Sequence, residues 1–556
     1  MKQICIALFC IGGILAAQSQ TNESNLNREL TVEKEYTPSL RDADKLNRLP
    51  EVKMPEAPKS QAEYSNYTLD CNIPPYFQAI KAKNYFTDFA TSKKRGYLDL
   101  GLGTLFNFDG DAGYQILNSS TNRLSVFASR RSSNSTVHYL QADETGKMKI
   151  NDNLFGTDFL HQWKKLKISA NALYVYSGFN DYGYTPASTP PNKDRVNQRF
   201  LIHTGMESLN NNNIIFKAKL TYTLFTQKLP FADELFTGKE NRVIADVDVL
   251  SNQWFGIAAS IKSYQYQSRE QLQIELFDYD DYTTLSAKPY ILLEGNVWDI
   301  KLGVSFDLQA GKVKNFLFAP NVHFNWRPVD IFHLYVTATG GIQDNCNYNS
   351  RLNNRYIFPA YRIQDSKIPL DATVGLSYTP VANLGLNFFA GNTWIYNEHF
   401  LPNMVPFYYD ISLYKLGGNI KYDYQGMVDF DVQLLYNHWN ILEAKELIFN
   451  PSGIAAEAWN KPVFIGKAKV GVNIPHLPLR CDLNYHLETG RKTLNYNAET
   501  EQMKNIHDLS LSANYILNPT VSFFAKVNNL LFQKYDIWYA YPAQNCNIMA
   551  GASIKF

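Results

Sequence analysis

The sequence predicts an all-β chain, a transmembrane antiparallel β-barrel of about 22 strands that follows a short, extended N-terminal leader. Three observations support this prediction. The last residues, Asn545 to Phe556, alternate apolar and polar side chains up to a terminal Phe. The first residues have the pattern of an export signal. Between them, alternating runs recur from Arg95 onward, separated by connections that are short and long in turn.

The N-terminus predicts export. A basic start, Met1-Lys2, precedes an apolar run from Ile4 to Ala17, and the polar sequence QSQTNESN follows. This order is typical of a secretory signal peptide, here residues 1–19, with cleavage between Ala16 and Ser19. A membrane-spanning helix needs roughly 20 apolar residues, and this run is shorter. Any membrane insertion of the mature chain is therefore expected to use strands.

Residues 20–94 differ from the rest of the chain. The stretch Leu49–Tyr67, LPEVKMPEAPKSQAEYSNY, is rich in Pro, Lys and Glu, which favours an extended conformation. We expect this leader to lie in the periplasm or inside the barrel lumen, and the barrel itself to comprise residues 95–556.

The alternation within the barrel region has the period of a strand with two different faces. Between Val428 and Asn437 the even positions carry Val, Phe, Val, Leu and Tyr, whereas the odd positions are mostly Asp, Gln and Asn. In a transmembrane barrel one face meets lipid and the other a hydrated lumen, so buried polar partners are not required. A soluble sandwich also alternates, so the connections are the better discriminator.

Short connections alternate with long ones. The predicted tight turns are Lys164-Lys165, Asn210–Asn213, Ser251-Asn252, Arg327-Pro328, Pro380-Val381, Gln425-Gly426, Pro475–Pro478 and Asn518-Pro519. The predicted long loops are Phe179–Val196, Ser268–Thr284, Gln343–Ile368, Asn397–Asp410, Asn440–Lys461 and Gly490–Glu501. Short periplasmic turns and long outer loops are the barrel arrangement, and barrels of about 22 strands are plugged transporters.

Composition and spacing argue against other classes of protein. Lys and Arg number 53 against 52 Asp and Glu, which lacks the basic excess of a nucleic-acid binder. The ten His residues have no metal-ligand spacing, and no catalytic constellation is recognisable. We expect no enzyme activity, no metal and no cofactor.

Two parts of the chain resemble one family. Arg95–Asn134, with the upstream segment Thr31–Val52, is similar to TonB-dependent-receptor-like outer-membrane barrels of the Bacteroidota. Val521–Phe556 resembles the last two strands of such receptors, with Asn528-Asn529-Leu530 in the expected place. The resemblance implies an outer-membrane location, outer-membrane lipid around the barrel, and Phe556 as an assembly signal. A recognisable plug domain is absent from the sequence.

The resemblance also implies uptake or passage of an extracellular small-molecule solute. TonB is the implied partner, and Glu29, Leu30, Thr31 and Val32 are a weak match to the segment that binds it; an ordinary extended tail is the alternative. The other hypothesis is a scaffold or assembly barrel that docks lipoprotein or periplasmic partners.

Aromatic residues in the predicted loops are the candidate solute contacts, because apolar patches on a surface often mark a binding site. The candidates are Tyr356, Phe358, Trp394, Phe400, Phe407 and Trp459. The alternative is that these rings pack loops together. A second aromatic set near the predicted periplasmic turns, Trp254, Trp298, Trp326 and Tyr335, is expected to form the girdle at headgroup depth.

Overall fold

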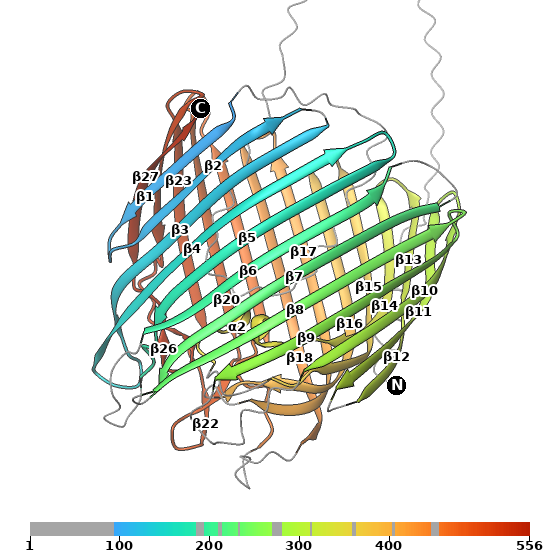
Figure 1. Ribbon diagram of the computed structural model, residues 1–556. Helices are drawn as coiled ribbons and strands as arrows, with labels where there is room; N and C mark the ends of the chain where they lie inside the picture. Colours follow the sequence, from blue (N-terminus) through green and yellow to red (C-terminus); the bar gives the residue numbers. More distant parts are fainter. Residues whose placement is uncertain are drawn as a thin grey trace, which may run out of the picture. The chain divides into compact units, whose positions relative to one another are not determined.

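The computed structural model describes residues 94–556 apart from nine gaps (Figure 1). The gaps are residues 120, 185–193, 210–213, 232–233, 270–280, 312–313, 358–362, 403–405 and 446–454. The predicted signal, residues 1–19, and the predicted leader, residues 20–94, lie outside the described residues except for Lys94. Among the described residues no helix is long and apolar enough to cross a membrane.

Most of the described chain is β-strand, and 23 of its strands form one closed antiparallel sheet. These strands are β1 (Gly96–Gly103), β2 (Phe108–Asn118), β3 (Asn122–His138), β4 (Thr145–Gln162), β5 (Leu166–Asn180), β6 (Asp194–Ser208), β7 (Ile214–Phe231), β8 (Glu234–Ser251), β9 (Phe255–Arg269), β10 (Tyr282–Glu294), β11 (Trp298–Gly311), β12 (Asn315–Pro320), β13 (Val322–Val329), β14 (Phe332–Gln343), β15 (Ser366–Val381), β16 (Leu384–Phe400), β17 (Phe407–Tyr424), β18 (Val428–Ala444), β19 (Phe464–Asn473), β20 (Leu479–Thr489), β23 (Ile506–Ile516), β24 (Val521–Asn528) and β27 (Asn547–Lys555).

The other elements lie in the connections: helix α2 (Asn347–Asn353), the paired strands β21 (Lys492–Leu494) and β22 (Thr500–Gln502), and the paired strands β25 (Asp536–Trp538) and β26 (Tyr541–Pro542).

The barrel has 22 strand positions. Strands β12 and β13 pair with successive parts of β11. The ladder between them is interrupted at Asn321, because the preceding residue, Pro320, has no backbone N–H to donate. The 23 strands therefore fill 22 positions, and the predicted fold class and strand number are confirmed.

The two ends of the barrel sheet close against each other. Strand β1 pairs with β27 from Tyr97↔Lys555 to Gly103↔Met549. The amides of Arg95 and Gly96 both donate to the carbonyl oxygen of Phe556 at 2.7 Å. The Phe556 ring packs so closely on Gly96 that a Cβ atom there would force the ring to shift. The terminal aromatic residue thus lies at the seam of the barrel.

The long connections lie at one end of the strands, as predicted, but short connections, such as those after β1 and β11, also occur at that end. Lys164-Lys165 and Gln425-Gly426 lie in tight turns. Two predicted turns are displaced by two or three residues, because Pro328 and Pro380 lie inside strand ends at irregularities of the ladder. A proline is tolerated in a strand at such a bulge, where no ladder hydrogen bond is needed from its nitrogen.

The two faces of the wall differ as the alternation predicts. On β18, Phe430, Leu434 and Tyr436 point outward and are 38–45% exposed. Asp431 lies on the other face, 3.3 Å from Lys421 of the neighbouring strand. Outward apolar and inward charged side chains are the arrangement of a membrane barrel with a wet lumen.

Three of the four predicted girdle residues are exposed near the short turns: Trp254, Trp298 and Trp326. The prediction for Tyr335 is wrong. Its ring covers Gly375, and its hydroxyl donates to Asn387 on the face that carries the lumenal polar residues. The turn at Asp330 and the irregularity before it set the phase of β14, and they place Tyr335 inward.

Candidate functional site

The long connection between β14 and β15 folds into the barrel. We call its first part, Asp344–Ile357, the crossing segment; it contains α2, which lies within the outline of the barrel in Figure 1. The two ends of the connection are held together at the rim. The amide of Asn345 donates to Asp365, and its side-chain amide donates to the carbonyl oxygen of Gln364 at 2.8 Å and to Ser366 at 3.0 Å.

Helix α2 docks against the inner face of β6 to β9. At its start, the Nζ atom of Lys262 on β9 lies 2.6 Å from Asp344. Arg242 on β8 donates to Asn349 at 3.3 Å. Tyr348 accepts a hydrogen bond from Arg199 of β6, whose guanidinium lies 5.1 Å from the Tyr348 ring centroid. Cations of the wall therefore hold the polar and aromatic groups of the helix.

The far end of the crossing segment reaches β4 and β5. Arg355 donates to both carboxylate oxygens of Asp152 on β4, each at 3.1 Å, and to Ser177 on β5 at 3.3 Å. Strand β4 is the fourth position of the wall and β14 is the thirteenth, so nine of the 22 positions separate the two attachment points. The segment therefore runs along the inner face of the wall from β9 to β4 and joins strands nine positions apart.

A tyrosine cluster joins the crossing segment to the outer loops. The Tyr356 ring stacks on Tyr541 of β26 with centroids 4.5 Å apart, and contacts Tyr182 edge-on at 5.6 Å. Tyr541 also donates to Asp181, which pairs with Arg195 of β6. Three connections, after β5, β14 and β24, therefore meet above the lumen.

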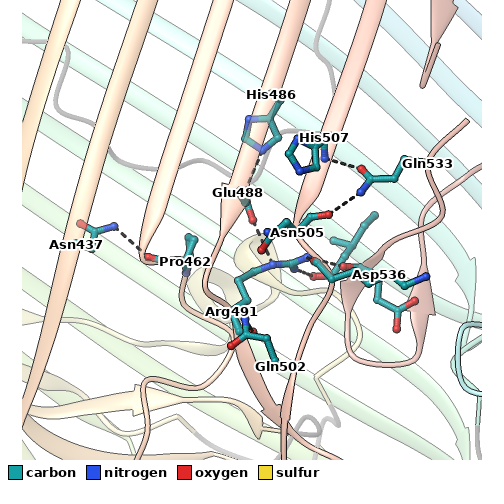
Figure 2. Close-up of polar contacts among 12 residues, drawn as sticks. Asn437, Pro462, His486, Glu488, Arg491, Gln502, Asn505, His507, Gln533 and Asp536 are labelled. Atoms are coloured by element: carbon teal, nitrogen blue, oxygen red, sulfur yellow. Dashed lines mark hydrogen bonds and ion pairs between the residues drawn. The ribbon is translucent and has the colours of Figure 1, made fainter. Parts of the chain in front are cut away.

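A polar tie joins the loops after β20 and β24 beside the tyrosine cluster (Figure 2). Arg491, only 2% exposed, donates to the carbonyl oxygens of Asp536 at 2.9 Å and Ile537 at 2.8 Å. Its Nε atom lies 3.6 Å from Glu488. The Gln533 side chain joins the amide of His507 to the carbonyl oxygen of Asn505. Burial raises the pKa of Asp536, whose side chain accepts hydrogen bonds from Gln141 and the amide of Ala540.

The structure places the predicted aromatic residues in different surroundings. Phe400, Phe407 and Trp459 lie in one buried cluster with Tyr409 and Leu494. Trp459 is fully buried and its indole N–H donates to Tyr409 at 3.0 Å. These three rings therefore pack within the protein, as the alternative that they hold loops together predicts.

The remaining predicted site residues are separate from that cluster. Trp394 is 47% exposed on β16. Tyr356 is the one candidate that lies in the crossing segment. Phe358 and the segment Glu29, Leu30, Thr31 and Val32 lie outside the described residues.

Sequence reasoning missed the residues that hold the crossing segment and the outer loops: Arg355, Asp152, Arg491 and the docking cations of β6 to β9. One feature of the sequence could have indicated that this connection is unusual. The run from Asp344 to Arg355 lacks strand alternation and carries Arg351 and Arg355 among amides, which is unusual in a loop of a neutral chain. Within the described residues no group of three or more His, Cys, Asp or Glu side chains is placed to hold a metal ion.

Comparisons with known proteins agree with the fold. No family model matches the chain, and no curated protein matches it. Similar solved structures include the FrpB iron transporter from Neisseria meningitidis, with 9% identity, 83% of this chain and 81% of that chain covered, and a TM-score of 0.66. The copper transporter OprC has 11% identity, coverage of 83% and 82%, and a TM-score of 0.62. The ferripyoverdine receptor of the Pseudomonas aeruginosa outer membrane has 13% identity, coverage of 83% and 72%, and a TM-score of 0.60.

Proposed function

We propose that this chain is a receptor-like barrel of the outer membrane that takes up, or lets pass, an extracellular small-molecule solute. The observation that carries the proposal is a closed barrel of 22 positions whose lumen holds its own crossing segment, attached to the inner wall as far as β4. The barrels with this fold in the comparisons are named as iron and copper transporters and as a ferripyoverdine receptor. We infer a non-enzymatic role without a resident cofactor.

The lumen offers a polar route. Its inward charges are paired, as in Lys415–Asp371 at 3.3 Å and Lys526–Asp109 at 3.7 Å. The Arg355 and Asp152 side chains are 21% and 25% exposed, so water reaches both groups. Ion pairs that water reaches are weak, usually about 0–1 kcal/mol. The Arg355–Asp152 contact can therefore be exchanged for water or for a polar solute at small cost.

The energy source is the second part of the proposal. We propose that residues 1–19 are removed on export, that residues 20–94 form a leader below or inside residues 95–556, and that Glu29, Leu30, Thr31 and Val32 contact TonB. The resemblance of the chain's ends to Bacteroidota receptors supports this. Cross-linking of a Thr31→Cys variant to the periplasmic domain of TonB tests it, with Thr87→Cys as the control, because cross-linking is expected only at position 31.

A permeability measurement tests the route. The full chain and a variant with residues 347–356 replaced by Gly and Ser are reconstituted into liposomes, and swelling in sucrose is followed. We expect slow swelling with the parent chain and fast swelling with the variant. The same replacement is then combined with deletion of the leader. If liposomes with this double variant still do not swell, passage through the lumen is contradicted.

The closed mouth also suits the second hypothesis, a scaffold that docks lipoprotein or periplasmic partners. A barrel that only holds partners has no need of an opening. Purification after mild detergent extraction separates the two: a stoichiometric partner together with an impermeable lumen favours the scaffold.

A further inference from the structure

Five exposed cations project from the outer face of one sector of the wall. They are Arg130 on β3, Lys147 and Lys149 on β4, Lys228 on β7 and Lys239 on β8. Their direction follows from the strand alternation, since Lys147 and Lys149 share the face of Phe155, which is 55% exposed. Lys239 likewise shares the face of Val243, which is 41% exposed. We call this set the outward basic patch.

The outward basic patch lies between the apolar band and the long-loop end of the barrel. Lys149 is six residues from Phe155 and Lys239 is four residues from Val243, in each case toward the long loops. At ~3.3 Å per residue in tilted strands, Lys149 and Lys239 lie roughly 10–15 Å beyond the band. That is the depth of the lipid headgroups in the leaflet nearest the long loops.

Four of the five cations form like-charge pairs. Lys147 and Lys149 are two residues apart on one face of β4. Lys228 and Lys239 are diagonal neighbours, because Lys228 pairs with Thr237 and Lys239 pairs with Thr226 in the same ladder. Like charges at such positions repel each other.

The pairs lack the acidic partners that the lumenal cations have. Within the described part of the chain, none of the five makes an ion pair with a carboxylate, whereas Lys415 and Lys526 on the inner face each have one. Polar side chains lie opposite two of the outward cations: Asn153 is registered opposite Arg130, whose guanidinium also lies 5.9 Å from the Phe108 ring centroid, and Gln267 is opposite Lys239. An anion with several acceptor oxygens would relieve the repulsion between the cations. It could accept hydrogen bonds from the cations and from the neighbouring side-chain amides.

We propose that the outward basic patch binds phosphate groups of lipid in the outer leaflet, with one phosphate between Lys228 and Lys239 and another between Lys147 and Lys149. Lysine suits this position because its apolar stem can cover the barrel wall while the ammonium reaches the headgroups. The partner is a phosphorylated glycolipid of the lipid A type, since the patch faces the leaflet beside the long loops. This inference depends on the transmembrane fold and is independent of the solute.

The experiment measures bound lipid by native mass spectrometry of the full chain in detergent, after mixing with bis-phosphorylated lipid A or with the same lipid freed of its phosphates. The test variant is Lys228→Gln with Lys239→Gln. The control is Lys164→Gln with Lys165→Gln, two exposed lysines in the short turn at the other end of the barrel. Both variants lose two positive charges. A third variant, Lys228→Arg with Lys239→Arg, keeps the charge.

We expect the parent chain, the control and the Arg variant to bind bis-phosphorylated lipid A equally. The Gln test variant should bind about tenfold less, because each lysine near an anionic headgroup contributes to attraction. The loss should shrink as salt rises. Equal binding by test variant and parent, or equal binding of the lipid without phosphates, would overturn the proposal. Heat-modifiability on a gel verifies that each variant is folded.

Discussion

Arg355 and Asp152 meet on the inner face of the wall, with two guanidinium nitrogens each 3.1 Å from a carboxylate oxygen, although 203 residues separate them in the chain. The first belongs to the connection after β14, and the second to β4. Their contact fixes the far end of the crossing segment. The start of the segment is held separately, by Asn345 at the rim and by the cations of β6 to β9.

The reactivity of a buried thiol, that of Cys346, can report whether the start of the crossing segment stays in place. Cys346, 2% exposed, precedes α2 and packs on Tyr264 and Tyr282, and burial raises the pKa of its thiol. Lys262→Glu should repel Asp344 and expose Cys346, which would then react with maleimide at least about tenfold faster. Peptide-resolved mass spectrometry checks this. Labelling of Cys481, distant in sequence and on β20, is the internal control and should not change. An unaltered Cys346 rate would mean that Lys262 does not hold the segment.

Arg491 should hold the loop after β24 in place. Arg491→Met leaves two buried carbonyl oxygens and Glu488 without their cation, which costs about 3–5 kcal/mol in similar buried pairs. We expect trypsin to cleave after Lys534 much faster in this variant. Lys492→Met is the matched control, because Lys492 is 40% exposed and its ion pair with Glu457 lies at the surface. Equal cleavage in the two variants would argue against the polar tie.

The two faces of β18 should respond differently to substitution. Val432→Arg places a charge on the lipid face and should destabilise the barrel by about 2–4 kcal/mol if the position is at mid-bilayer. Asp431→Asn removes only a partly exposed pair with Lys421 and should cost less than about 1 kcal/mol. Denaturant unfolding in lipid vesicles measures both. Similar losses would mean that the assignment of the faces is wrong.

Deletion of Phe556 should impair barrel closure. The change removes the acceptor of the Arg95 and Gly96 amides and the donor to the carbonyl oxygen of Gly96, each worth about 1 kcal/mol, and a ring that stacks on Tyr114. The heat-modifiable form in membranes should fall, whereas Lys555→Ala should leave it intact. A normal amount of folded protein after the deletion would count against this role.

The wall of the barrel could be predicted from the sequence because each strand repeats the same local rule. The alternation around Val432 and Asp431 assigns the faces without knowledge of any distant contact, and the Lys164-Lys165 turn marks where a strand ends. The rule fails where the ladder is irregular. The bulges near Pro328 and Pro380 shift two turns, and the phase after Asp330 places Tyr335 inward.

The crossing segment could not be predicted, because its structure depends on contacts between distant parts of the chain. Helix α2 is only seven residues long and Cys346 makes no side-chain cap, so local signals for it are weak. Nothing in the sequence near Arg355 identifies Asp152 as its partner. The same limit applies to Trp459, whose burial against Tyr409 depends on how two loops fold together.

Single-channel conductance in planar bilayers tests most directly whether the crossing segment closes the lumen. The parent chain should be almost silent, Arg355→Glu should open, and Arg355→Glu with Asp152→Arg should be silent again because the ion pair is restored with reversed charges. Lys421→Glu, which alters a pair within one side of the wall, should stay silent. Equal conductance in the parent chain and Arg355→Glu would contradict the closure of the mouth by this segment.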